Sequence, residues 1–173
     1  MATRRDYLAL SGSAFAASLS GCLSSGLLAG GPPDVQMESE PPERGVPTAN
    51  PDLSANSTVT TLAVGRGSDH RQVWLWNETD RNLEVAVEIS REGDGEPWFQ
   101  QSYDLDTDVN LAIDLRESRD YAITVGVPDR TETVEISKSE FDCNASVTDV
   151  AIRATEFDTA SIKTTEGCKV GFW

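Results

Sequence analysis

Apolar and polar residues alternate with a period of two over much of the chain beyond about residue 58. The clearest alternating stretches are residues 83–90, 109–115 and 121–127. This period is typical of strands that turn one face to a core and the other to water. Turn-forming residues separate the stretches, at 78–81, 93–95, 116–119 and 128–130. With about seven short strands at regular spacing and no helical stripe, the pattern predicts an all-β fold, an antiparallel β-sandwich over residues 58–173.

Two further apolar segments, residues 147–154 and 160–164, predict a β-hairpin at the C-terminal end. Trp74 and Trp76 share one face of a strand that carries Val73 and Leu75 on the other. A strand that is apolar on both faces is usually covered on both, so we expect the hairpin to cover the tryptophans. The alternative is an exposed docking patch for a partner protein or a glycan.

Residues 22–57 have the composition of a flexible linker. Six of the eight prolines fall here, together with glycine, serine and acidic residues: Pro32, Pro33, Pro41, Pro42, Pro47 and Pro51. Few large apolar side chains are present to offset the ordering entropy, which predicts a disordered, extended spacer.

The first 21 residues predict an export signal. Arg4 and Arg5 precede an apolar stretch over residues 7–19, which is too short to cross about 30 Å of hydrocarbon. Small residues then lead to a cysteine, in the order Leu19, Ser20, Gly21, Cys22. A cationic start, a short apolar middle and a small-residue end describe a signal peptide that is removed.

Both parts of this signal resemble known export families. The run Thr-Arg-Arg-Asp-Tyr-Leu over residues 3–8 resembles the twin-arginine consensus, with Tyr7 in the usual Phe position. Leu-Ser-Gly-Cys resembles the lipobox of prokaryotic lipoproteins. The resemblance implies that the Cys22 thiol carries lipid, becomes the N-terminus and holds the protein on the extracellular face of the cell membrane. The alternative is a buried structural cysteine in an N-terminal helix.

The charge balance is strongly acidic, with 14 basic against 29 acidic residues and a formal net charge of -15. Such a surface argues against binding nucleic acid or anionic lipid headgroups. An acidic excess with only three lysines resembles the proteins of salt-loving archaea, in which concentrated salt screens the repulsion. An acidic protein of an ordinary bacterium is the alternative.

Cys143 and Cys168 remain as an even pair once Cys22 is lipidated. In an oxidising compartment such a pair favours a disulfide, here closing the loop that contains the hairpin. No second ligand cluster supports metal binding by these two thiols.

Residues 71–137 resemble small immunoglobulin-like domains of archaeal surface lipoproteins. The matching features are Trp-Asn-Glu-Thr at 76–79 and Asp-Tyr-Ala-Ile-Thr-Val at 120–125. The resemblance implies an immunoglobulin-like sandwich in which the Tyr121 hydroxyl bonds the backbone across a turn. The chain lacks the cysteine pair of true immunoglobulins, and the resemblance carries no activity.

Few residues are suited to chemistry. His70 is the single histidine and stands in a polar run, where we expect a solvated loop residue. Asp104, Asp106 and Asp108 alternate, but the spacing lacks the glycine and glutamate of an EF-hand, so a hydrated acidic edge is preferred over a calcium site. We therefore expect no enzyme activity, no cofactor and no metal.

Three sequons fit N-glycosylation of an exported protein, at Asn56, Asn77 and Asn144. Asn77 can instead serve the adjoining turn through its side-chain amide. The sequence thus predicts a lipid-anchored surface protein whose sandwich is a non-enzymatic module that binds an envelope component, such as a surface protein or a glycan. The alternative is a lipoprotein that binds a small solute or a metal ion; an enzyme is the least favoured class.

Overall fold

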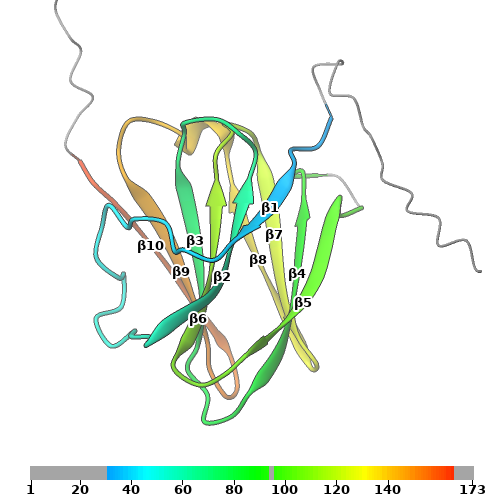
Figure 1. Ribbon diagram of the computed structural model, residues 1–173, viewed down its shortest axis with the longest axis vertical. Coiled ribbons are helices and arrows are strands. Elements are labelled where there is room, and N and C mark those ends of the chain that lie inside the picture. Colours follow the sequence, from blue (N-terminus) through cyan, green and yellow to red (C-terminus); the bar gives the residue numbers. More distant parts are fainter. Residues whose placement is uncertain (1–30, 94–95, 166–173) are drawn as a thin grey trace, which may run out of the picture. The chain divides into compact units, whose positions relative to one another are not determined.

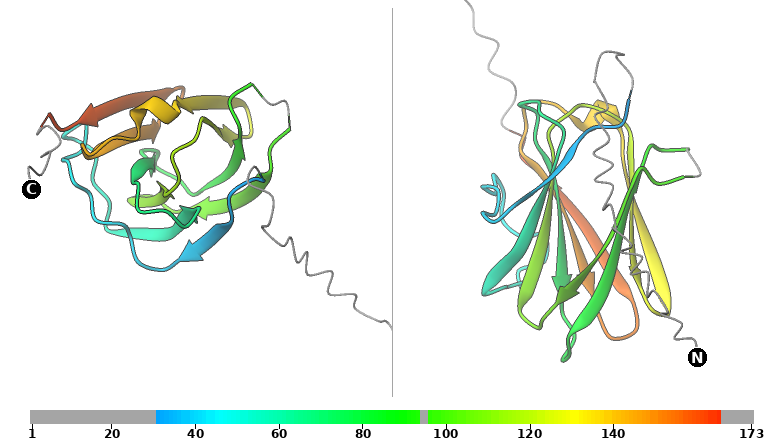
Figure 2. Two further views of the ribbon diagram at one scale, coloured as in Figure 1. Left: turned by 90° about the horizontal axis from the view of Figure 1, so that it is seen from above. Right: turned by 45° about the vertical axis from the view of Figure 1, so that its right-hand side comes forward.

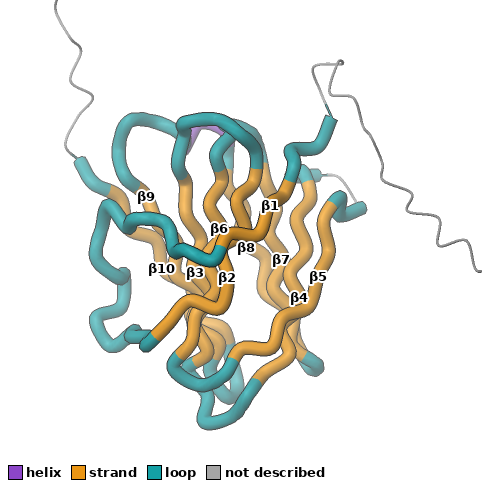
Figure 3. Tube along the Cα trace, viewed as in Figure 1, coloured by secondary structure: helices purple, strands orange, loops and turns teal. Residues whose placement is uncertain are grey.

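Two β-sheets make up most of the chain that the computed structural model describes, residues 31–93 and 96–165. The chain divides into two units, residues 1–31 and 32–173, and all the described elements belong to the second. This second unit is an all-β sandwich, and its only described helix is the single 3₁₀ turn η1 (Lys138–Glu140) (Figures 1 and 3).

The two sheets contain six and four strands. The six-stranded sheet has the order β1 (Val35–Glu38), β2 (Ser57–Val64), β6 (Val109–Leu115), β3 (Arg71–Asn77), β9 (Ser146–Ile152) and β10 (Phe157–Lys163). The four-stranded sheet has the order β5 (Phe99–Leu105), β4 (Leu83–Ser90), β7 (Tyr121–Val127) and β8 (Arg130–Ile136). Figure 2 shows the strands of both sheets arranged around one interior.

The three clearest alternating stretches form β4, β6 and β7, as the sequence predicts, and β9 and β10 form the predicted antiparallel hairpin. Two pairings differ from the antiparallel expectation, because β2 runs parallel to β6 and β3 runs parallel to β9. Parallel neighbours need long connections. They therefore cannot be recognised from the hairpin signals in the sequence.

The main core lies between the sheets. The inward positions of both sheets contribute aliphatic side chains that are fully buried, among them Leu75, Leu111, Ile123 and Ile89. Tyr121 closes the interior at one end, where its hydroxyl donates a 2.9 Å hydrogen bond to the carbonyl of Glu117. Burial raises the pKa of Tyr121 to about 12, so the hydroxyl keeps its proton and acts as a donor at neutral pH. The predicted bond from this tyrosine to the backbone is confirmed.

The predicted linker over residues 22–57 is wrong for residues 32–57. Strand β1 lies inside it and pairs antiparallel with β2. Val46 and Leu53 are buried, each with only 6% of its surface exposed. The prolines here fix an extended chain that packs on the sandwich, and composition alone could not distinguish this from a solvated spacer.

The two sheets differ in how their outer faces are covered. The four-stranded sheet follows the predicted alternation, with the outward residues of β4 exposed or half-buried. In β3 every residue is buried on both faces, and in β6 only Val109 is even partly exposed. The outward polar residues of β6, Asn110 and Asp114, are therefore not the water-facing residues that the pattern predicts. A third layer, which includes Val46 and Leu53, packs on this face of the sheet against Trp74, Trp76 and Ala112.

Candidate functional site

The layer over the six-stranded sheet is the segment of residues 40–56, which we call the strap. It leaves β1, crosses the outer face of β2 and β3, and returns to the start of β2 (Figure 1, cyan). The strap is fastened at both ends. The Thr61 hydroxyl donates to the Glu40 carbonyl at 2.9 Å, and the Asn56 amide donates to the Asp108 carbonyl at 2.8 Å.

Asp149 is the centre of the contact between the strap and the sheet. Its carboxylate is 1% exposed and accepts both terminal nitrogens of Arg44, at 3.0 and 3.1 Å. It also accepts the backbone amide of Ala49 at 2.8 Å and the indole Nε1 of Trp76 at 2.9 Å. Four donors on one buried carboxylate satisfy its charge within the protein.

Trp74 and Trp76 form the surface on which Arg44 lies. Their rings stack with centroids 5.9 Å apart, and the guanidinium carbon of Arg44 stands 4.8 Å and 5.6 Å from the two centroids. Both tryptophans are at most 5% exposed. The core interpretation of this pair is confirmed, but the strap covers the rings, where the C-terminal hairpin was expected. The hairpin lies beside them, with Val147 and Ala151 of β9 in the same apolar cluster.

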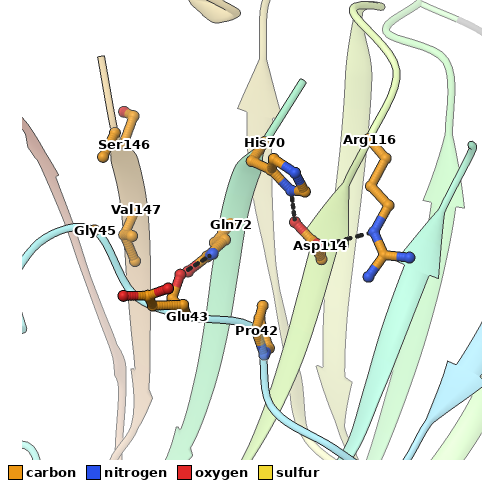
Figure 4. A pocket seen from close by; sticks show the side chains of 10 residues that line it. Pro42, Glu43, Gly45, His70, Gln72, Asp114, Arg116, Ser146 and Val147 are labelled. Carbon is orange, nitrogen blue, oxygen red and sulfur yellow. Dashed lines mark hydrogen bonds and ion pairs between the residues drawn. The ribbon is translucent and has the colours of Figure 1, made fainter. Parts of the chain in front are cut away.

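A pocket of about 410 Å³ opens beside the strap, on the outer face of the same sheet. The strap forms one wall, and the ends of β3, β6 and β9 form the rest (Figure 4). The lining residues are Pro42, Glu43, Gly45, His70, Gln72, Asp114, Arg116, Ala145, Ser146 and Val147. Six of these ten residues are polar and four are apolar, so the lining combines hydrogen-bonding groups with apolar surface, as small-molecule sites do.

Within the pocket, His70, Asp114 and Arg116 form a row of polar contacts (Figure 4). Asp114 is 1% exposed; one oxygen lies 3.1 Å from His70 Nδ1 and the other accepts Arg116 Nε at 2.8 Å. The terminal nitrogens of Arg116 donate to both carboxylate oxygens of Glu38, at 2.7 and 2.8 Å. These hydrogen bonds lower the pKa of Glu38 and raise the pKa of Arg116, so both groups stay charged at neutral pH. His70 is thus a half-exposed residue that bonds a buried carboxylate, which the sequence did not reveal.

Gln72 connects the pocket to the strap. Its amide nitrogen donates to the Glu43 carbonyl at 2.8 Å, and its oxygen accepts the indole nitrogen of Trp74 at 3.0 Å. The strap residues at the pocket are therefore held by the same strand that carries the tryptophans. Strap position and pocket shape depend on one set of contacts.

A histidine held by a buried carboxylate is also part of the machinery of hydrolytic triads. Ser146 lines the same pocket, but its side chain lies apart from His70 in Figure 4. No hydroxyl or thiol of the described residues is hydrogen-bonded to His70. The arrangement can orient an imidazole toward a ligand, and it lacks the nucleophile contact that acyl transfer needs.

The predicted acidic edge is exposed. Asp104, Asp106 and Asp108 all lie at the surface, and Asp106 accepts a 2.7 Å hydrogen bond from Asn82. Residues 31–93 and 96–165 contain no group of three His, Cys, Asp or Glu side chains that could hold a metal ion.

The three sequons differ in their surroundings. Asn77 is buried, and its amide donates to the carbonyls of Arg81 and Leu105 at 2.9 and 2.8 Å. Its oxygen accepts the backbone and hydroxyl of Thr79. The glycosylation expected at Asn77 is therefore wrong for the folded domain, and the turn interpretation is confirmed. Asn56 is exposed and Asn144 is half-buried, so both stay predictions.

Several predicted residues lie outside the described part of the chain. These are the signal residues Arg4, Arg5, Leu19, Ser20 and Gly21, the lipidation site Cys22, and Cys168. Cys143 lies in the exposed loop between η1 and β9, and its pairing with Cys168 stays a prediction.

Sequence reasoning missed Arg44, Asp149 and Asp114. The two aspartates occupy polar positions of alternating strands, where a solvent-facing residue is the ordinary interpretation. Asp149 stands opposite Trp74 in the paired strands β3 and β9. These two residues are 75 positions apart and their strands run parallel, so no local signal in the sequence reveals the pairing.

Neither a membrane span nor a known relative adds to this picture. No helix in the described part of the chain is both long and apolar enough to cross a membrane. No protein-family model matches the chain, and searches of curated proteins and of solved structures find no match.

Proposed function

We propose that this chain is an exported, lipid-anchored, non-enzymatic binding protein of the cell surface, and that the pocket beside the strap holds a small polar solute. The observation that carries the binding function is the pocket itself, about 410 Å³ in volume and lined by convergent polar side chains. Volumes of several hundred Å³ are typical of small-molecule sites.

The rigidity of the pocket walls supports this function. Asp114 is buried and bonded on both oxygens, which fixes the His70 ring and the Arg116 guanidinium. The opposite wall is fixed by Gln72 and the buried Arg44 pair. Preorganised polar groups lose little entropy when a ligand binds, so the site favours recognition.

The rival function, docking through an exposed aromatic patch, has less support. It required Trp74 and Trp76 to be free at the surface, and both are covered by the strap. A binding role for a surface protein or a glycan would need another face of the domain. The solute interpretation, earlier the alternative, is therefore preferred over the envelope interaction.

Binding is tested by protein NMR with a panel of small polar solutes. We expect some of them to shift the resonances of His70 and Gln72 in the wild-type protein. His70→Trp should abolish the shift at Gln72 by filling the pocket, whereas Ser102→Trp, at an exposed position of β5 in the other sheet, should leave both shifts intact. Solute binding that is equal in both variants would contradict the proposed site.

Anchoring is tested separately. Cys22 supplies the thiol to which lipid would be attached, so Cys22→Ser should release the protein from membranes or leave it unprocessed. Cell fractionation with intact-mass measurement distinguishes these results. A membrane-bound mature product of unchanged mass would refute the lipid anchor.

A further inference from the structure

The pocket presents hydrogen-bond acceptors to a ligand, and His70 is the first of them. Asp114 accepts Arg116 Nε at 2.8 Å, and a guanidinium at this distance favours the carboxylate form of its partner, which has no proton to donate. It cannot donate to His70, so Nδ1 of the neutral ring carries the proton and donates to Asp114 Oδ1. The lone pair is thereby assigned to Nε2, the other nitrogen of a ring that is 55% exposed. His70 therefore offers an acceptor to the pocket.

The positive charge of the pocket is already neutralised. Arg116 is the one arginine or lysine in the lining, and each of its three nitrogens donates to a carboxylate, one to Asp114 and two to Glu38. A guanidinium held by two carboxylates has little attraction left for an anionic ligand. The pocket is thus poorly suited to a phosphate or a carboxylate.

The negative charge of the pocket is not neutralised. Glu43 lies on the strap at the pocket wall, and its carboxylate forms no ion pair or hydrogen bond with any described residue. The Glu43 backbone is held at the pocket wall, because its carbonyl accepts the Gln72 amide and its neighbour Arg44 is bonded to Asp149, while the Glu43 side chain itself is exposed. The whole chain carries a formal charge of -15, which adds a long-range attraction for cations.

We infer that the ligand of this pocket is a small organic cation that donates hydrogen bonds, with an ammonium or similar group between His70 Nε2 and the Glu43 carboxylate. This inference rests on the proposed function of the pocket and names the chemical class of its solute. Neutral polyols lack the charge for Glu43, and anions are repelled by it.

Three compounds with the same four-carbon chain separate these classes: 1,4-diaminobutane, 1,4-butanediol and succinate. Each is titrated into the wild-type protein at about pH 8, where imidazole is normally neutral, in the lowest salt at which the protein stays folded. The ring nitrogens of His70 are the readout, and they are free of overlap because the chain has one histidine. A hydrogen bond from the ligand should shift the Nε2 signal and leave Nδ1 in place.

We expect the diamine to bind most tightly, the diol weakly and succinate not at all. Glu43→Gln should weaken diamine binding about threefold, the scale of an exposed ion pair. Glu84→Gln, at an exposed position of β4 in the other sheet, should change nothing.

The contrary results are distinguishable. If the diol or succinate shifts His70 at least as strongly as the diamine does, the ligand class is wrong and the binding pocket stands. If none of the three shifts any pocket resonance up to about 50 mM, both the class and the proposed solute function are wrong.

Discussion

Replacing Asp149 by asparagine should detach the strap from the sheet. The side chains have nearly the same shape, but asparagine keeps one acceptor oxygen and gains two donors. In the wild type, Arg44 Nη2 and the Ala49 backbone amide both donate to Asp149 Oδ2. If the asparagine oxygen takes the place of Oδ1 and still accepts Trp76 Nε1, its NH₂ group faces these two donors. Each buried donor left without an acceptor costs about 1–3 kcal/mol, so we expect a loss of about 3–5 kcal/mol in the free energy of unfolding. That is a large share of the roughly 5–15 kcal/mol typical of a domain.

Urea unfolding, followed by tryptophan fluorescence at constant salt, measures this loss. Urea is uncharged and leaves the ion pairs unscreened. The matched control is Asp158→Asn, which makes the same change in the 2.9 Å pair with Arg153 on the exposed side of the hairpin. Both partners there are more than a third exposed, so the expected loss is about 0–1 kcal/mol. Equal losses below about 1 kcal/mol in both variants would refute the idea that Asp149 holds the strap.

Three further predictions concern stability and export. Glu38→Gln should make the stability of the fold less dependent on acid pH. In the wild type the Arg116 hydrogen bond lowers the folded pKa of Glu38, so the pair stabilises the fold above the ordinary pKa of 4.5 and loses this contribution as the pH falls through the folded pKa. Thermal unfolding at a series of pH values measures this dependence. A variant as acid-sensitive as the wild type would contradict this. Cys143→Ser should lower the free energy of unfolding by about 3–4 kcal/mol if the predicted disulfide forms, and two reactive thiols in the denatured, unreduced wild-type protein would disprove the bond. Replacing Arg4 and Arg5 together by lysine should block export in a secretion assay, because the twin-arginine receptor recognises paired guanidinium groups that lysine reproduces poorly. Normal surface levels of the variant would favour the general secretory route.

The strands were predictable where local pattern and environment agree. Residues 83–90 alternate and form β4, whose outward residues meet water as the period-two rule requires. The turn role of Asn77 was also open to prediction, because an asparagine amide bonds nearby backbone without help from distant residues. The turn bonds of Asn77 join residues that are close in sequence, and the alternation of β4 repeats the same environment at every second residue.

The strap and the pocket were not predictable for the opposite reason. Arg44, Val46 and Leu53 are isolated among prolines and polar residues, with no period that marks an apolar face. Their burial depends on Trp74, Trp76 and Asp149, which come from strands far along the chain. From the sequence, Asp114 is likewise expected to face water, because its contact with His70 and its place in the pocket beside the strap depend on the tertiary structure. Pairings across a hundred residues are set by tertiary packing, which one sequence does not display.

The ordered segment from Pro32 through the strap also limits how far the domain can stand from its proposed anchor. With residues 22–57 as a free spacer, the sandwich could range on the order of 100 Å from the lipid. Because the second unit begins at Pro32, only nine residues lie between it and Cys22, a span of ten Cα-to-Cα steps. Covalent geometry allows at most about 36 Å over that length. A protein anchored in this way would work in the layer next to the bilayer, and its solutes would have to diffuse down to the membrane surface to reach it.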